Sequence, residues 1–282
     1  MTSPDQVVAC TPGAAVSNAV THLLHLEHSD STQDEVRRRL AGGFIPPFAV
    51  RSDSQRQGRG RAGESWQSPT GNLYLSAAMG PFPTDLQLWL PTLSWHVSDA
   101  VCSSLVPWEL HPRIKWPNDL LIGDRKVGGI LIETEQSTHH GTIAIVGIGL
   151  NISTAPDVSP PGLQSTRLID HISASNATKL LTPAALAIDL VDILFADAPA
   201  TFLDLARNQR RRALYLGRLA WVGEWVRAER DGHDPVTGVL TDVDDAGGLQ
   251  LYNEAGETVR LTGGVRRLRR LDGQGANDVV GD

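Results

Sequence analysis

Cysteine, aromatic residues and net positive charge are all scarce in this sequence. Cys10 and Cys102 are the two cysteines among 282 residues, and they lie too far apart to form a metal-binding or redox spacing. We therefore expect two reduced thiols, as in a cytoplasmic protein. The formal net charge of −7 gives no indication of a general nucleic-acid-binding surface, so each basic residue needs its own explanation.

Long apolar segments are missing as well. No run approaches the roughly 18 to 20 residues of a membrane-spanning helix, and the N-terminus has no signal-peptide pattern. The hydrophobic content is 41% and the charged content 20%, which are ordinary values for a folded protein. These features predict a cytoplasmic protein that does not span a membrane.

Three glycines in the segment QGRGRAGESWQSPTGNLYLS (residues 57–76) spell the dinucleotide-binding pattern G-x-G-x-x-G. A Rossmann loop must open a helix, because the pyrophosphate binds at the helix N-terminus. Here turn residues and then a strand follow the third glycine, which argues against a Rossmann site. The glycines instead allow tight backbone geometry and close approach to a ligand, while Arg59 and Arg61 suit a carboxylate or phosphate. The alternative is a flexible basic surface loop.

Hydrophobic spacing predicts mixed helices and strands over the larger, N-terminal part of the chain. Helices are expected at 31–43, 85–105, 183–198 and 200–214, and strands at 48–50, 72–79 and 141–153. Two apolar runs around Gly123 and Asp124 predict a β-hairpin within residues 113–135.

From Leu216 the pattern changes to short strands separated by Gly and Asp turns, which is typical of a small closed barrel. We therefore predict an α+β protein with a domain boundary near Tyr215. The expected parts are an N-terminal segment that is partly disordered or forms one short helix, a larger domain, a small barrel and a disordered tail. Their ranges are 1–28, 29–215, 216–271 and 272–282.

Three motifs in this order resemble those of biotin protein ligases. They are the glycine segment above, KWPNDLLIGDRKVGGILIE at 115–133 and VGIGLNIS at 146–153. The resemblance implies a mixed-sheet ligase catalytic domain of the biotin/lipoate ligase type, followed by an SH3-like β-barrel. It also implies that the enzyme joins biotin to ATP, with Mg²⁺ on the ATP phosphates, to form biotinyl-5′-adenylate and pyrophosphate. Biotin would then pass to one lysine of a biotin carboxyl carrier domain, in an acyl-CoA or pyruvate carboxylase.

The resemblance further implies a set of residues that contact biotin. Arg59, Gly60 and Arg61 match the core of a loop that closes over biotin and the adenylate phosphate. Lys126 matches a lysine that reaches the biotinyl carboxyl group and the α-phosphate. The remaining biotin contacts implied by position are Ser31, Thr32, Gln33, Gln55 and Gly129. Gln33 stands where the family's short Ser-Thr-Asn sequence has Asn, so this contact departs from the family pattern.

A second implied set lies on the ATP side. Its members are Arg61, Trp66, Lys115, Asn118, Asn151 and Arg269. Trp66 would stack on adenine or cover it, and a tryptophan of the core is the alternative. Arg269 resembles an arginine that reaches back to the nucleotide, and its alternatives are Arg266, Arg267 and Arg270.

The residue types agree with this chemistry. Attack of a carboxylate on a phosphate brings negative groups together, so the cations Arg59, Arg61, Lys115 and Lys126 would offset that charge. Asp119 is the expected group for deprotonating or positioning the acceptor lysine, and holding the hairpin turn through its backbone is the alternative. We therefore expect a catalytic set of Arg59, Arg61, Lys126 and Asp119. No dense carboxylate cage is visible, so we expect no protein metal site and a metal that arrives with ATP.

Two other functions were weighed. Lipoate-type ligases and octanoyltransferases share the architecture, but the GRGR loop and KWPND favour biotin. A bifunctional ligase–repressor needs an N-terminal winged helix, and the residues before Ser31 are too few to form one. We therefore expect a single-function ligase that does not bind DNA.

Overall fold

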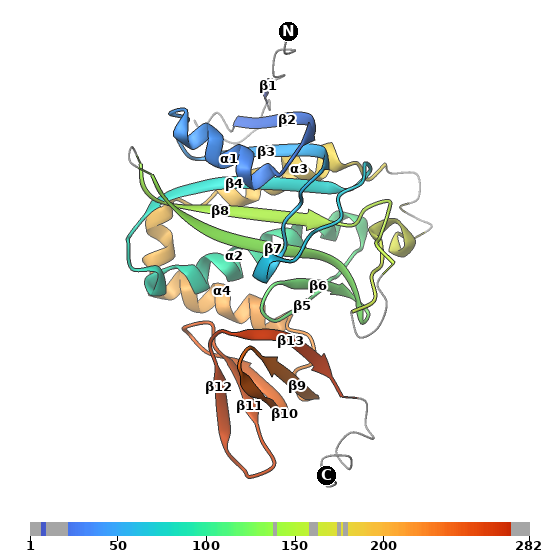
Figure 1. Cartoon of the computed structure of the whole chain (residues 1–282), viewed down its shortest axis with the longest axis vertical. Coiled ribbons are helices and arrows are strands. Elements are labelled where there is room, and N and C mark those ends of the chain that lie inside the picture. The colour runs from blue at the N-terminus through green and yellow to red at the C-terminus, as the bar shows by residue number, and fades with distance from the viewer. Residues whose placement is uncertain are drawn as a thin grey trace.

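The computed structural model describes residues 7–9, 22–137, 140–157, 163–173, 176 and 180–271. These residues form an eight-stranded sheet with helices on both faces and, beyond helix α4, a separate five-stranded sheet (Figure 1). None of the described helices is long and apolar enough to cross a membrane.

The larger sheet is mixed, as predicted. Its strands in chain order are β1 (Val7–Ala9), β2 (His22–Ser29), β3 (Phe48–Gln55), β4 (Leu73–Phe82), β5 (Arg113–Lys115), β6 (Asp119–Ile122), β7 (Arg125–Ser137) and β8 (Gly141–Leu150). In space the order is β1-β2-β3-β4-β8-β7-β6-β5. Strands β2 and β3 pair in parallel because helix α1 connects them as a crossover, whereas the predicted hairpin pairs β6 with β7 in antiparallel fashion.

The described residues include four α-helices, of which α1, α2 and α3 pack against this sheet and α4 packs against α2. They are α1 (Thr32–Ala41), α2 (Leu90–Leu105), α3 (Pro183–Phe195) and α4 (Leu205–Gly217). Short 3₁₀ turns occur at Arg61–Gly63, Leu86–Leu88, Val106–Trp108, Leu168–His171 and Pro199–Leu203. The predicted starts of α1 and α3 are confirmed, since Ser31 is the N-cap of α1 and the Thr182 hydroxyl accepts a hydrogen bond from the Ala185 amide.

Two helices begin later than predicted. Residues 86–88 form a 3₁₀ turn capped by Asp85, so α2 starts at Leu90, with Pro91 in its first turn. Likewise, Pro199–Leu203 form a 3₁₀ turn, and the Asp204 side chain caps α4. In both places a short 3₁₀ turn precedes the α-helix, which hydrophobic spacing alone does not reveal.

The apolar residues of the central strands alternate between two cores. Val50, Ala78 and Ile145 face α1 and pack with its Val36 and Leu40 in a small cluster. The intervening residues, among them Ala49, Ala77 and Val146, face the opposite side and join the main core with α2 and α3. Because both faces of β4 and β8 are covered, the sheet is rigid where a ligand would lie on it.

The C-terminal sheet is antiparallel. Its strands are β9 (Trp225–Arg230), β10 (His233–Val243), β11 (Leu249–Tyr252), β12 (Thr258–Leu261) and β13 (Val265–Arg270), in the spatial order β12-β11-β10-β9-β13. Within residues 180–271 no pairing joins the outer strands β12 and β13, so the predicted closed barrel is not found. The short strands and their Gly turns are confirmed.

Both ends of the larger sheet differ from the predicted organisation. Strands β1 and β2 fall in the segment expected to be disordered or helical, yet β2 is an integral strand beside β3. At the other edge, the Ile114 amide donates to Arg218 O at 2.7 Å and the Ala220 amide donates to Ile114 O at 2.8 Å. Residues just past the predicted boundary at Tyr215 therefore pair with the larger sheet.

The two cysteines are placed differently. Cys102 is a free thiol buried in α2, and burial raises its pKa to about 12, so it stays protonated near neutral pH. Cys10 and the predicted tail 272–282 lie outside the described residues.

Candidate functional site

A pocket of about 340 Å³ lies on the larger sheet beneath the glycine loop (residues 56–66). Its walls come from the start of α1, the glycine loop, strands β4, β7 and β8, and the turn between β5 and β6. A second pocket of about 530 Å³ adjoins it towards the C-terminal sheet. All the predicted site residues line the first pocket except Asn151 and Arg269, which line the second.

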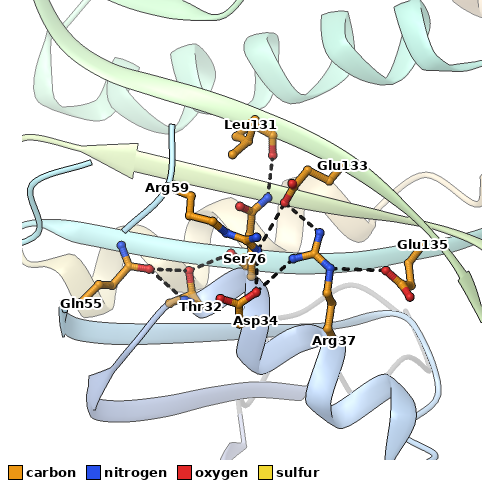
Figure 2. Close-up of polar contacts among 10 residues, drawn as sticks. Thr32, Asp34, Arg37, Gln55, Arg59, Ser76, Leu131, Glu133 and Glu135 are labelled. Atoms are coloured by element: carbon orange, nitrogen blue, oxygen red, sulfur yellow. Dashed lines mark hydrogen bonds and ion pairs between the residues drawn. The ribbon is translucent and has the colours of Figure 1, made fainter. Parts of the chain in front are cut away.

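One end of the first pocket is built from neutral hydrogen-bonding groups. The amide and hydroxyl of Thr32 donate to Gln55 Oε1 at 2.8 and 3.1 Å, and the Thr32 and Ser76 hydroxyls lie 2.7 Å apart (Figure 2). Gln55 Nε2 in turn donates to Ser68 Oγ at 2.9 Å. These bonds fix the orientation of each group before a ligand arrives. Sequence reasoning missed Ser76, although a serine within an apolar strand was a usable signal.

The floor of the pocket consists of glycines on β7 and β8, namely Gly129, Gly147 and Gly149. A Cβ added at Gly147 would lie 3.1 Å from Gln33 Cδ, and one at Gly149 would lie 2.8 Å from Trp66 Cε2. Gln33 and Trp66 therefore rest directly on the glycine floor. Gln33 also donates from Nε2 to Leu131 O at 3.2 Å, which ties α1 to β7.

Trp66 lines both pockets. Its indole lies over the floor, its Nε1 is buried with no hydrogen-bond partner, and Lys126 Nζ lies 5.1 Å from the ring centroid. The alternative of a core tryptophan is therefore wrong, because the ring faces the two pockets and not the apolar interior.

The opposite end of the pocket carries two lysines around one carboxylate. Asp119 Oδ2 lies 2.8 Å from Lys115 Nζ, and Asp119 Oδ1 lies 2.5 Å from Lys126 Nζ. Burial alone would raise the pKa of Asp119, but Lys126 and Lys115 outweigh it and lower that pKa to about 2. With two cations for one anion, this end has a surplus of positive charge that suits a carboxylate or phosphate.

The two loop arginines reach different ends of the pocket. Arg61 Nη1 donates to Asn118 Oδ1 at 3.3 Å, near the lysines, and Asn118 Nδ2 donates to Ile130 O at 2.8 Å. Burial lowers the pKa of Arg61, and the nearby Asp119 opposes this. Arg59 instead lies 2.7 Å from Asp34 and 3.6 Å from Glu133 (Figure 2). Sequence reasoning gave the arginines one shared task, and their partners differ.

The glycine loop is a compact turn. The Gly60 amide donates to Glu64 O at 2.7 Å, and the Trp66 amide donates to Gly58 O at 2.8 Å. A Cβ on Gly58 would overlap Trp66 O, so only glycine permits this close approach.

The residues of the second pocket are held by the surrounding structure. Asn151 is buried, and its Nδ2 donates to Thr166 O at 3.2 Å. Arg269 Nη2 lies 3.1 Å from Glu229 Oε1, with its Nε buried and unpartnered. Arg266 lines both pockets and sits at a bulge in the pairing of β13 with β9. Of the four candidate arginines, Arg266 alone lines the first pocket, while all four line the second.

No three His, Cys, Asp or Glu side chains within the described ranges come together as a metal-binding group. Asp119 does not fit a divalent cation well, because both its oxygens already face lysines.

Comparisons with known proteins agree with this geometry. Residues 46–151 match the biotin/lipoate A/B protein ligase family. The chain is 32% identical to the biotin–[acetyl-CoA-carboxylase] ligase of Paracoccus denitrificans, over 83% of this chain and 95% of that protein. It is 29% identical to the enzyme of that name from Mycobacterium tuberculosis, over 82% of each chain.

A solved structure gives the same result. The biotin protein ligase from Aquifex aeolicus in complex with biotin and ATP matches with a TM-score of 0.67 and 26% identity, covering 88% of this chain and 99% of that one. The chain belongs to the biotin–[acetyl-CoA-carboxylase] ligase family of enzymes.

Proposed function

We propose that this protein joins biotin to ATP, giving biotinyl-5′-adenylate and pyrophosphate, and then transfers biotin to a lysine of a biotin carboxyl carrier domain. The observation that carries the proposal is one pocket with a neutral, hydrogen-bonding end and an end with two lysines around one carboxylate. An activation reaction needs both, because a neutral ring must be recognised while a carboxylate attacks a phosphate.

The neutral end suits the ureido ring of biotin. We propose that Ser31, Thr32, Gln33 and Gln55 contact it, with Gly129 and its neighbouring glycines beneath. The hydrogen bonds from Thr32 to Gln55 support this, because a preoriented set of donors and acceptors loses little entropy when the ligand binds.

The charged end suits the reacting groups. We propose that Lys126 contacts the biotinyl carboxylate and the α-phosphate, that Lys115 and Arg61 face the phosphates, and that Gly60 allows the loop to close. Attack of a biotin carboxylate oxygen on the α-phosphorus forms the new P–O bond, and the bond to pyrophosphate breaks. The cations stabilise the negative charge that gathers during this step.

Asp119 acts by position in this proposal. With a pKa of about 2, its carboxylate is a weak acceptor for a proton from a lysine whose ordinary pKa is about 10.4. It holds Lys115 and Lys126 at the reacting centre and presents a negative charge to the acceptor ammonium. After releasing one proton to solvent, the acceptor lysine attacks the biotinyl carbonyl carbon as a neutral amine. The amide bond forms, the C–O bond to AMP breaks, and the second amine proton is released to solvent as AMP leaves.

The second pocket suits the remainder of the nucleotide. We propose that Trp66, Asn118, Asn151 and an arginine of β13, Arg269 or Arg266, surround it, and that Mg²⁺ enters on the ATP phosphates. We also propose that the catalytic domain extends past Tyr215 to about Trp221. The pairing of residues 218–220 with β5 supports that extension.

The partner and setting are also part of the proposal. We propose that the carrier domain belongs to an acyl-CoA or pyruvate carboxylase, that the enzyme works in the cytoplasm, and that it does not bind DNA.

Incubation with a purified carrier domain, biotin and ATP tests the function. We expect a mass increase of one biotinyl group on the carrier and none when ATP is omitted or Lys126→Gln replaces the enzyme. The matched comparison uses lipoate in place of biotin. Modification of the carrier by lipoate in preference to biotin would overturn the proposal and favour a lipoate-type ligase.

A further inference from the structure

Arg59 belongs to an ion-pair network that lies beside the pocket (Figure 2). Its Nη2 lies 2.7 Å from Asp34 Oδ1 on α1 and 3.6 Å from Glu133 Oε2 on β7. Arg37 approaches the same two oxygen atoms, at 3.3 Å from Asp34 and 2.9 Å from Glu133. Two carboxylates are thus bridged by two guanidiniums, one from the scaffold and one from the glycine loop. We call Arg59, Asp34, Arg37 and Glu133 the Arg59 network.

The charges of the scaffold favour an incoming cation. Besides Asp34 and Glu133, a third carboxylate, Glu135, lies 3.3 Å from Arg37 Nε. Without Arg59, three carboxylates would face the single guanidinium of Arg37. The loop arginine therefore completes a site whose charge it offsets.

The two carboxylates of the network lie outside the space where a ligand would lie. Asp34 and Glu133 are absent from the residues that line either pocket, whereas Arg59 lines the first. Substitution of either carboxylate therefore alters the position of Arg59 without removing a contact to a ligand.

Apart from Arg59, the glycine loop is held to the scaffold at its base, near its tip and through Trp66, whose indole rests on the glycine floor. At its base the Arg56 amide donates to Ser29 O at 3.0 Å and the Gln57 amide donates to Asp30 O at 2.8 Å. Near its tip, Arg61 donates to Asn118 at 3.3 Å. Arg59 supplies the tie between these points, and it joins the loop to both α1 and β7.

We propose that Asp34 and Glu133 are positioning residues that hold the glycine loop closed over the pocket through Arg59. Because the loop covers the pocket, they also lengthen the retention of the activated biotin intermediate. Retention rests on the proposed function, whereas loop closure does not. Neither carboxylate is a catalytic residue, since neither touches the pocket.

The competing role is purely structural: Glu133 would fasten α1 to β7 through Arg37, Asp34 would orient Arg37 from within α1, and neither would affect the loop. Glu135→Gln is the matched control, because Glu135 pairs with Arg37 and has no contact with Arg59. A structural role predicts similar behaviour for Asp34→Asn, Glu133→Gln and Glu135→Gln. A positioning role predicts that Asp34→Asn and Glu133→Gln open the loop, whereas the control Glu135→Gln does not.

Limited trypsin digestion of the folded, ligand-free enzyme measures loop opening directly. The readout is the rate of cleavage after Arg61, followed by mass spectrometry of the fragments. We expect Asp34→Asn and Glu133→Gln to raise that rate by roughly two- to fivefold each, the range for a partly exposed ion pair, and Glu135→Gln to leave it unchanged. High salt should raise the wild-type rate towards that of the variants.

Arg59→Ala provides the second arm. In that background Asp34→Asn should cause no further increase in cleavage after Arg61, since Asp34 acts through Arg59. An undiminished effect of Asp34→Asn without Arg59, or equal rates for all three carboxylate variants, would overturn the proposal. Thermal unfolding of each variant confirms that the fold is retained.

Release of pre-formed biotinyl adenylate tests retention. We expect Asp34→Asn and Glu133→Gln to release it roughly two- to fivefold faster than wild type and Glu135→Gln to match wild type. If wild type forms no adenylate, the proposed function fails while the trypsin result still decides the role of the network. Adenylate release that is unchanged in variants whose loop opens faster would overturn the link between closure and retention.

Discussion

The two ends of the pocket differ in charge. At the α1 end, Thr32, Gln55 and Ser76 are neutral, and their polar atoms bond to one another. At the hairpin end, Lys115 and Lys126 share the single carboxylate of Asp119. The first end is electrically balanced before a ligand arrives, and the second is not.

This difference separates recognition from chemistry. Neutral hydrogen bonds contribute modest, directional energy that selects a ligand by shape. Surplus cations stabilise charge that is greatest in the transition state, so they act on the rate. Changes at the hairpin end should therefore lower turnover, whereas changes at the α1 end should weaken binding of biotin.

Lys126→Gln should give the largest effect. Loss of a cation at the reacting centre is expected to slow adenylate formation by about 100- to 1,000-fold, the range for removing a preorganised charge-stabilising group. The melting temperature should fall only moderately, because the buried Asp119 carboxylate loses one lysine partner but keeps Lys115. Pyrophosphate release and calorimetry measure the two quantities. A large drop in melting temperature with normal activity of the folded fraction would make Lys126 structural.

Arg61→Ala comes next. Its charge-assisted contacts are worth about 1.5–3 kcal/mol, so adenylate formation should fall and adenylate release should rise by roughly ten- to a hundredfold. Quench-flow on the purified enzyme gives both rates. An unchanged adenylate lifetime would show that Arg61 does not face the phosphate.

Asp119 predicts a pH-dependent contribution to stability. Its pKa falls from 3.8 to about 2 on folding, so the stabilisation is complete above pH 4 and is lost as pH falls towards 2. The shift corresponds to about 2 kcal/mol. Urea unfolding of wild type and Asp119→Asn measures it, and the difference between them should shrink over that pH interval. A difference that is constant with pH would mean that the lysines do not lower this pKa.

Thr32→Val should give the smallest effect, and it should change only the affinity for biotin. Loss of the hydroxyl removes its bonds to Gln55 and Ser76, at a cost of about 1 kcal/mol, or roughly fivefold in biotin affinity. The Michaelis constant for ATP should stay unchanged. Equal losses for biotin and ATP would remove the distinction between the two ends.

Much of the site could be predicted because motif residues sit on regular, local structure. Lys115, Asp119 and Lys126 lie on three successive strands, β5, β6 and β7, and the turn at Gly123 between β6 and β7 was evident from the sequence. Thr32 and Gln33 came from the resemblance to the family's Ser-Thr-Asn sequence, and the N-cap at Ser31 places them in the first turn of α1. Within each motif the residues are close in the chain, so no long-range contact had to be inferred.

The rest depends on contacts between distant segments. Asp34 and Glu133 look like ordinary solvated charges in the sequence, and only the approach of α1 to β7 gives them a common partner. Arg266 and Arg269 could not be ranked, since a bulge in β13 changes which of them faces the first pocket. Open or closed pairing of the C-terminal strands likewise depends on how β12 and β13 meet.

The crossing between the two sheets has a thermodynamic consequence. Before the chain enters the C-terminal sheet, residues 218–220 bond to Ile114 at the edge of the larger sheet. Trp116 Nε1 donates to Gly247 O at 3.0 Å in the C-terminal sheet, and Trp221 Nε1 donates to Asp124 Oδ1 at 3.1 Å where the chain crosses between the two sheets. Unfolding either sheet would strip buried indoles and an edge strand of their partners. The two sheets should therefore melt in a single cooperative transition, with calorimetric and van't Hoff enthalpies that agree.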